Sequence, residues 1–213
     1  MHNQIKTLQN IVTRKGSSRV LTFSTPHVFK ALHILSKQKY TSRITFCKEL
    51  HIGEGAVRTM IMHLKNSGLV DSIKAGTFLT TKGKKFSKKI FEVVAAQCKI
   101  ESCNIAREKF NHAILLRDYA SMIGNGMDQR DYAMFYGAKG ATTLAFENGQ
   151  FVFPGENHDC LSDDPKTKES LLENLNPNEN DLVIIGSSDD SFVAEISAIN
   201  SVLWTLAKHE KHV

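Results

Sequence analysis

The sequence predicts an α+β protein made of a basic N-terminal domain and an acidic C-terminal domain. Residues 1–103 carry 18 Lys and Arg against 5 Asp and Glu, a net charge of +13, whereas residues 104–213 carry 9 against 17, a net charge of −8. Apolar residues recur at helical spacing in the first part, and the second part adds short apolar runs of strand length. Opposite charges of this size indicate two domains with different partners, which we place at residues 1–100 and 104–213.

The N-terminal domain begins with two helical patterns. Apolar positions at helical spacing predict a helix over residues 3–13, followed by a basic loop at residues 14–19. Thr25 is expected to cap the next helix, which has Pro26 in its first turn and runs to about Gln38.

Two more helices and a hairpin follow. Ser42 is expected to cap a short helix, and a tight turn leads from it into a helix over residues 54–67. That helix is expected to close at Gly68, because glycine readily takes the left-handed conformation. Two short alternating runs then predict a hairpin that turns at Ala75-Gly76. The order helix, turn, helix and hairpin is that of a winged helix-turn-helix domain.

The rest of the chain mixes helices with strands. A helix is predicted over residues 82–98, and residues 98–103 are the expected hinge between the domains. The elements predicted for the acidic part are strands at 112–116 and 181–186, a hairpin of 142–146 with 150–153, and helices at 129–136, 165–174 and 191–208. This mixture predicts a small mixed α/β domain.

The helix over residues 54–67 has the pattern of a helix that reads DNA. Its apolar positions repeat at three and four residues, so one face can anchor it in its own domain. The major groove admits one helix, in which Arg58 can offer two hydrogen bonds to guanine and Thr59 can contact a phosphate or a thymine methyl group. The residues expected on or near the outer surface are Gly55, Ala56, Arg58, Thr59, Met62 and His63.

Cationic side chains surround this helix in the sequence. Each lysine taken singly is typical of an ordinary solvated surface, but the excess of cations within a helix-turn-helix pattern indicates double-stranded DNA as a partner. The residues expected to contact phosphates are Arg43, Lys48, Lys65, Lys74, Lys82, Lys84 and Lys85, with Lys88 and Lys89 beside them.

Two stretches of the sequence carry a family resemblance. IGEGAVRTMIMHLKNSGLV followed by LTTKGKKF resembles the winged-helix domains of archaeal and bacterial repressors. Residues 104–213, with GMDQRDYAMFYGAKGATTLAFENGQFVFPG and DLVIIGSSDD, resemble the second domain of an uncharacterised archaeal family that pairs it with such a winged helix. The resemblance implies a two-domain archaeal transcription regulator and implies no catalytic residue.

The acidic domain offers a candidate ligand site. Ligands of mixed sheets settle beyond the carboxyl ends of strands, where loops and helix N-termini present polar groups. Polar residues follow both predicted buried strands, although a capped helix beside a salt-bridged loop gives the same pattern. The candidate ligand-binding residues are Arg117, Asp128, Gln129, Arg130, Ser187, Ser188 and Asp189.

Several functions have no motif in the sequence. No nucleophile and base pattern indicates an enzyme, and the glycine-rich residues 137–143 lack the spacing of a phosphate-binding loop. The four cysteines form no CxxC pair, so we expect neither a disulfide framework nor a metal site. The N-terminus does not resemble a signal peptide, and no apolar run reaches the roughly 18 residues of a membrane span. We therefore expect a cytoplasmic protein without cofactor or membrane contact.

The function that fits these features is a DNA-binding transcription regulator. We expect the C-terminal domain to bind a small-molecule effector or to form a homodimer, because two-fold dimers suit half-sites one helical turn apart. Two alternatives remain at this point. One is an enzyme acting on small molecules with a DNA-binding appendage, and the other is an architectural DNA-binding protein without a regulatory role.

Overall fold

The computed structural model describes residues 2–13 and 21–208, and the loop predicted for residues 14–19 lies outside them. The chain divides into two compact units, unit 1 over residues 1–90 and unit 2 over residues 91–213. Together they give a mixed α/β protein with two separate sheets, as the sequence predicts.

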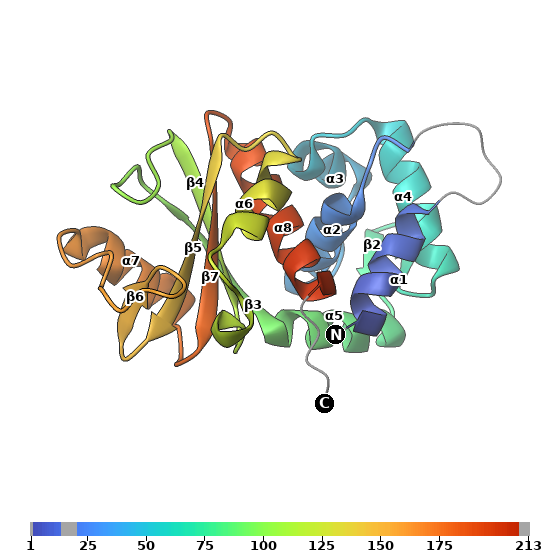
Figure 1. Cartoon of the computed structure of the whole chain (residues 1–213). Helices are drawn as coiled ribbons and strands as arrows, with labels where there is room; N and C mark the ends of the chain where they lie inside the picture. The colour runs from blue at the N-terminus through green and yellow to red at the C-terminus, as the bar shows by residue number, and fades with distance from the viewer. Residues whose placement is uncertain (1, 14–20, 209–213) are drawn as a thin grey trace. The chain divides into compact units, whose positions relative to one another are not determined.

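Unit 1 consists of helices and one antiparallel hairpin (Figure 1). In chain order its elements are α1 (His2–Val12), α2 (Thr25–Lys37), α3 (Arg43–Leu50), α4 (Glu54–Asn66), β1 (Val70–Ile73), β2 (Gly76–Leu79) and α5 (Thr81–Val93). The apolar face predicted for α4 is buried, because Val57, Met60, Ile61 and Leu64 are each 7% exposed or less. This burial fixes which side of α4 faces solvent.

The ends of these helices follow the predicted capping with one shift. The Ser42 side chain accepts a hydrogen bond of 3.0 Å from the Thr45 backbone N–H and so caps α3. Gly68 closes α4 with a φ of +73°. The cap of α2 is Ser24 rather than the predicted Thr25, which is the first residue of the helix itself.

The hairpin turns one residue earlier than predicted. Ile73 pairs with Gly76, so the two turn residues are Lys74 and Ala75. Gly76 has a φ of +138°, and a Cβ atom there would lie 2.8 Å from the Thr41 carbonyl oxygen. The glycine is therefore required where β2 approaches Thr41, not at the tip of the turn.

The helix predicted over residues 82–98 is wrong in its second half. α5 ends at Val93, and Val94–Ile100 forms strand β3, which pairs with β4 (Phe110–Leu116). β-Branched residues such as Val94 and Ile100 fit a half-buried strand, and pairing with β4 satisfies the backbone of this segment. The boundary between the units accordingly lies between Ile90 and Phe91, ahead of the expected hinge.

Unit 2 is built on a five-stranded sheet with the order β3-β4-β7-β5-β6, in which every neighbouring pair is antiparallel. Its remaining elements are β5 (Gly140–Glu147), β6 (Gln150–Val152), β7 (Asp181–Ser188), α6 (Met127–Met134), α7 (Pro165–Leu175), α8 (Ser191–Lys208) and a 3-10 turn at Ala120–Met122. The predicted Asn148-Gly149 turn joins β5 to β6.

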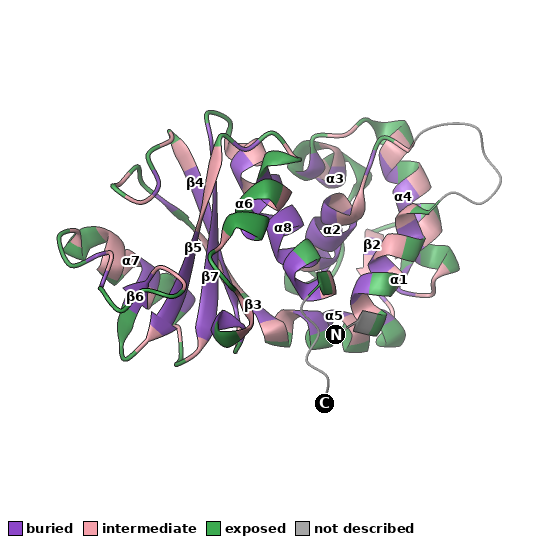
Figure 2. Ribbon diagram, viewed as in Figure 1, coloured by how far each residue is buried: buried purple, intermediate pink, exposed green. Residues whose placement is uncertain are grey.

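Helices cover both faces of this sheet (Figure 1). On one face Leu171 and Leu175 of α7 pack in a core cluster with Val183 and Ile185 of β7. On the other face lie α6 and α8, and α8 approaches so closely that a Cβ atom on Gly186 would lie 2.6 Å from the Ala194 carbonyl oxygen. The central strand β7 is buried over its whole length (Figure 2).

Gly83 gives a test of how tightly α5 packs on Leu69, the residue just before β1. A Cβ atom on Gly83 would lie 1.9 Å from the Leu69 carbonyl oxygen. Only a movement of the backbone can relieve this steric clash. We predict that Gly83→Ala lowers the free energy of unfolding by about 2 to 3 kcal/mol in a urea titration.

Gly55 is the matched control, because it is also helical and a Cβ atom there meets nothing within 4 Å. Gly55→Ala should leave stability unchanged or raise it by up to about 1 kcal/mol. Equal effects of the two substitutions would contradict the close packing of α5.

Candidate nucleic-acid interface

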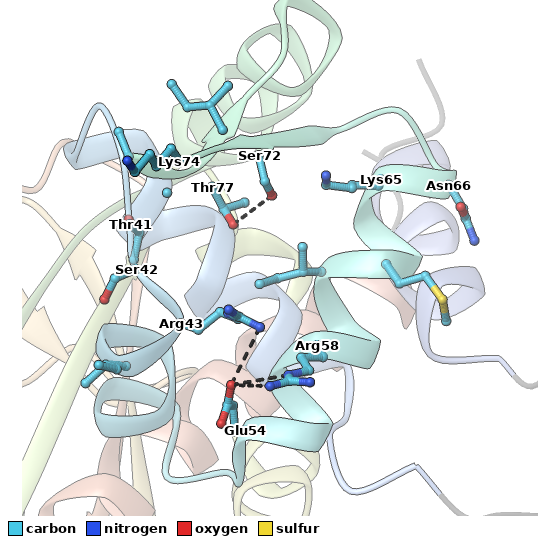
Figure 3. A pocket seen from close by; sticks show the side chains of 16 residues that line it. Thr41, Ser42, Arg43, Glu54, Arg58, Lys65, Asn66, Ser72, Lys74 and Thr77 are labelled. Carbon is cyan, nitrogen blue, oxygen red and sulfur yellow. Dashed lines mark hydrogen bonds and ion pairs between the residues drawn. The ribbon is translucent and has the colours of Figure 1, made fainter.

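A groove of about 760 Å³ lies between the helices and the hairpin of unit 1 (Figure 3). Its walls come from the start of α3, the solvent side of α4 and the β1–β2 hairpin. Four cationic side chains line it, namely Arg43, Arg58, Lys65 and Lys74. Glu54 is the carboxylate among the lining residues. The groove therefore presents an excess of positive charge to solvent.

One carboxylate holds two of these cations. Arg58 Nε and Nη2 donate to Glu54 Oε1 at 3.2 Å and 2.8 Å, and Arg43 Nη1 lies 3.6 Å from the same oxygen (Figure 3). The hydrogen bond and charge of Arg58 lower the pKa of Glu54, so this carboxylate is ionised at neutral pH. All three side chains are more than half exposed. Exposed ion pairs of this kind are weak, so a stronger anionic partner can replace the carboxylate.

The other two cations reach the groove from α4 and from the hairpin turn. Lys65 Nζ lies 3.1 Å from Asp71 Oδ1. The pKa of Asp71 is lowered first by the hydrogen bond from the Ser72 backbone N–H and then by the hydrogen bond and charge of Lys65. Lys74 occupies the two-residue turn and has no ion pair with any residue that the structure describes. Both ammonium groups are solvent-accessible and can contact an anion in the groove.

Large apolar side chains stand exposed among these charges. Ile44 at the start of α3 is 82% exposed, Met62 on α4 is 50% exposed, and Ile73 at the end of β1 is 52% exposed. All three line the groove. The groove thus exposes apolar as well as cationic side chains to solvent.

Six further residues predicted for DNA contact divide into two groups. Gly55 is exposed, Ala56 is half-buried, and the Thr59 hydroxyl donates to the Gly55 carbonyl oxygen at 3.0 Å, so these residues present a small surface at the start of α4. Lys48, Lys84 and Lys85 are exposed but do not line the groove.

Two predicted contacts have partners within unit 1 instead. His63 Nδ1 donates to the Ile11 carbonyl oxygen at 2.6 Å, and its ring lies edge-on to Phe23 at 5.8 Å. This histidine therefore joins α4 to α1 and does not face the groove. Lys82 Nζ donates to the Ser67 carbonyl oxygen at 2.7 Å and so satisfies the end of α4.

Glu54, Ile44 and Ile73 also line the groove, although they are not among the site residues predicted from the sequence. The spacing of Glu54 and Arg58, four residues apart on one helix, is a signal that predicts their ion pair. No local signal places Ile44 and Ile73 on one groove, because their proximity depends on how the hairpin packs against α3.

The ligand site predicted in the acidic part is not assembled. Leu116 pairs with Leu182 and Phe110 pairs with Ser188. Because β4 and β7 are antiparallel, the last residue of β4 and the last residue of β7 lie at opposite ends of this strand pair. The two ends are six residue positions apart along the strands, which corresponds to about 20 Å. Arg117 therefore lies far from Ser187 and Ser188.

The two serines also point to opposite faces of the sheet, because successive side chains of a strand alternate. Ser187 is buried, and its hydroxyl has no hydrogen-bond partner among the residues described. Ser188 Oγ accepts from the Asp190 backbone N–H at 3.3 Å. Asp189 forms an exposed ion pair with Lys139, which lowers the pKa of this aspartate.

Two of the three candidates on α6 attach it to α8. Gln129 is buried and donates from Nε2 to the Thr205 hydroxyl at 3.2 Å, and Asp128 forms an ion pair with Lys208. Arg130 is exposed. Within the described residues no group of three or more His, Cys, Asp and Glu side chains is arranged to hold a metal ion.

Two family models match separate parts of the chain. Residues 31–85 match the PH0730-like N-terminal domain, and residues 107–206 match a domain of unknown function (DUF4443). The fold is similar to that of the hypothetical protein PH0730 from Pyrococcus horikoshii OT3. The TM-score is 0.71 at 22% identity, over 86% of this chain and 93% of that chain. These matches support the resemblance to an archaeal two-domain family. No curated protein is similar to the chain.

No helix within the described residues has the length and apolar character needed to cross a membrane.

Asp181 gives a test of the structural role of Arg117. The buried Asp181 carboxylate accepts hydrogen bonds from Arg117 Nη1 and from the backbone N–H groups of Asp118 and Asn178, the last at 2.7 Å. We predict that Asp181→Asn lowers the free energy of unfolding by about 3 kcal/mol, because it removes a buried charge pair and leaves donors unsatisfied.

Asp189→Asn is the control, because it also removes one carboxylate charge. Asp189 lies just beyond the other end of β7, and its ion pair with Lys139 is exposed. The urea midpoint of this variant should stay close to that of the wild type. A stable Asp181→Asn variant would show that the Arg117–Asp181 pair does not anchor this end of β4 and β7.

Proposed function

We propose that unit 1 is a winged helix-turn-helix domain that binds double-stranded DNA, and that the protein is a transcription regulator. The observation that carries the proposal is the groove between α4 and the hairpin, with its four cationic side chains. Unit 1 has 17 Lys and Arg against 3 Asp and Glu, so the whole unit attracts a polyanion.

The element order supports this assignment. Helices α2, α3 and α4 followed by the β1–β2 hairpin correspond to the helices and wing of that domain type. In this assignment α4 is the recognition helix. Its buried residues anchor it, and its solvent side carries Glu54, Arg58, Met62 and Lys65 at spacings of three and four residues. A helix of this kind fits the width of the major groove.

The groove suits one sugar-phosphate strand of the duplex. With α4 in the major groove, the backbone beside it passes between α4 and the wing. Arg43, Lys65 and Lys74 then approach phosphates from three sides. The present ion pairs of Arg43 and Lys65 are exposed and weak, so exchange for phosphate oxygens costs little.

Lysines on neighbouring helices extend this surface. Lys48 on α3 and Lys84 and Lys85 on α5 are exposed and have no ion pair with a described residue. Such lysines add affinity for any duplex without reading its sequence. In this proposal sequence discrimination comes from α4, and general affinity comes from the surrounding cations.

For unit 2 we propose homodimerisation over effector binding. The candidate effector residues are dispersed over the sheet and α6, whereas large exposed apolar side chains occur on α6 and α8. These are Met127, Met134 and Trp204, with Phe135 directly after α6. Trp204 also stacks on Tyr132 at 5.8 Å, which joins the two helices into one surface. A dimer formed through unit 2 would bring two DNA-binding units to two half-sites.

Two substitutions separate base reading from phosphate binding. Duplexes selected from a random library provide the specific site, and the same duplex with scrambled sequence provides the reference. We predict that Arg58→Ala costs about 1 to 3 kcal/mol of binding free energy on the selected duplex and little on the scrambled one. Lys85→Ala should weaken binding to both duplexes equally and reduce the slope of log affinity against log salt by about 1.

Fluorescence anisotropy at several salt concentrations measures both effects. An Arg58→Ala variant that still distinguishes the two duplexes as the wild type does would exclude α4 as the reading helix. Absence of binding to any duplex in low salt would exclude DNA as the partner.

A further inference from the structure

We propose that Glu54 and Arg58 form a specificity pair in which Glu54 selects cytosine and Arg58 selects guanine at neighbouring positions of the binding site. This inference rests on the proposed DNA-binding function and names the bases that the groove recognises. It adds Glu54 to the site, a residue with a negative charge on a surface that is otherwise positively charged.

The first support is the unused hydrogen-bonding capacity of the pair. Glu54 uses only Oε1 for its bonds to Arg58, and Oε2 has no hydrogen-bond partner within the part of the chain that the structure describes. Arg58 donates through Nε and Nη2, which leaves Nη1 and the second Nη2 proton without a partner in the same part of the chain. Each side chain is thus held by the other and still presents free groups outward.

The second support is access. Glu54 and Arg58 are 56% and 62% exposed, and they begin the solvent-facing side of α4. Gly55 lies between them in the chain, and a Cβ atom there would meet nothing within 4 Å. The start of α4 can therefore approach base edges closely, with both side chains at the leading end of the helix.

The third support is the chemistry of the major groove. An ionised carboxylate only accepts hydrogen bonds, and the cytosine N4 amine is a donor there, whereas guanine presents the acceptors O6 and N7. Glutamate therefore fits cytosine, and the fork of an arginine fits guanine. One turn of helix separates the two residues, so they read neighbouring positions.

The fourth support is electrostatic. A carboxylate in a cationic groove repels phosphates and reduces the affinity for every duplex that offers it no donor. Arg43 lies farther from Glu54 than Arg58 does, at 3.6 Å against 2.8 Å, so Arg43 is the cation released to a phosphate on binding. Glu54 then stays with Arg58, and its charge is compensated only where a base amine faces it.

The test uses Glu54→Gln in the full chain, with Glu49→Gln as the matched control. Glu49 is an exposed glutamate on α3 that does not line the groove, so its substitution changes the net charge equally. Binding sites are selected from a random duplex library for each protein, and affinities are measured on the selected and scrambled duplexes.

We expect the wild-type site to contain cytosine and guanine at neighbouring positions. Glu54→Gln should move the preference at the cytosine position toward adenine, because a glutamine side chain pairs with adenine N6 and N7. It should lower discrimination at that position at least about fivefold and bind the scrambled duplex more tightly than Glu49→Gln does.

Two results would overturn the inference while leaving the proposed function intact. One is an unchanged selected sequence for Glu54→Gln, and the other is equal behaviour of the two glutamate variants. Failure of the wild-type protein to bind any duplex in low salt would overturn both the inference and the proposed function.

Discussion

The two reciprocal hydrogen bonds between Thr41 and Thr77 determine the shape of the groove. The backbone N–H of each residue donates to the carbonyl oxygen of the other at 2.9 Å, which ties the hairpin to the residues just before α3. Gly76 permits this contact, because a side chain there would meet the Thr41 backbone. Lys74 and Arg43 are held on facing walls by this bridge. The candidate site is thus a consequence of backbone pairing, and its charged side chains are positioned by it.

The two units use their charges differently. In unit 2, cations are paired with carboxylates at Arg117–Asp181, Lys139–Asp189 and Lys168–Asp159, so they contribute to stability or to solvation of the unit itself. In unit 1 the carboxylates are few, and Glu54 serves two arginines at once. Cations outnumber carboxylates there, and this imbalance is the basis of the proposal that unit 1 binds an external polyanion.

Local patterns predicted most helices and strands, whereas features that depend on distant contacts were missed. The periodicity of α4, the Ser42 cap and the Asn148-Gly149 turn each have a local physical cause, so the sequence predicts them correctly. Strand β3 depends on pairing with β4, and the separation of Arg117 from Ser187 depends on strand direction. Neither property is contained in a short stretch of sequence. His63 shows the same limit for side chains, since its bond to Ile11 spans 52 residues.

Methionine methyl signals in an NMR titration of the full chain with duplex DNA test the central claim most directly. Met62 lines the groove and Met127 lies on α6 of unit 2, and each is 50% exposed. If the groove binds DNA, the Met62 signal shifts as duplex is added while the Met127 signal stays in place. An unchanged Met62 signal at saturating duplex, or a shift confined to Met127, would contradict the account.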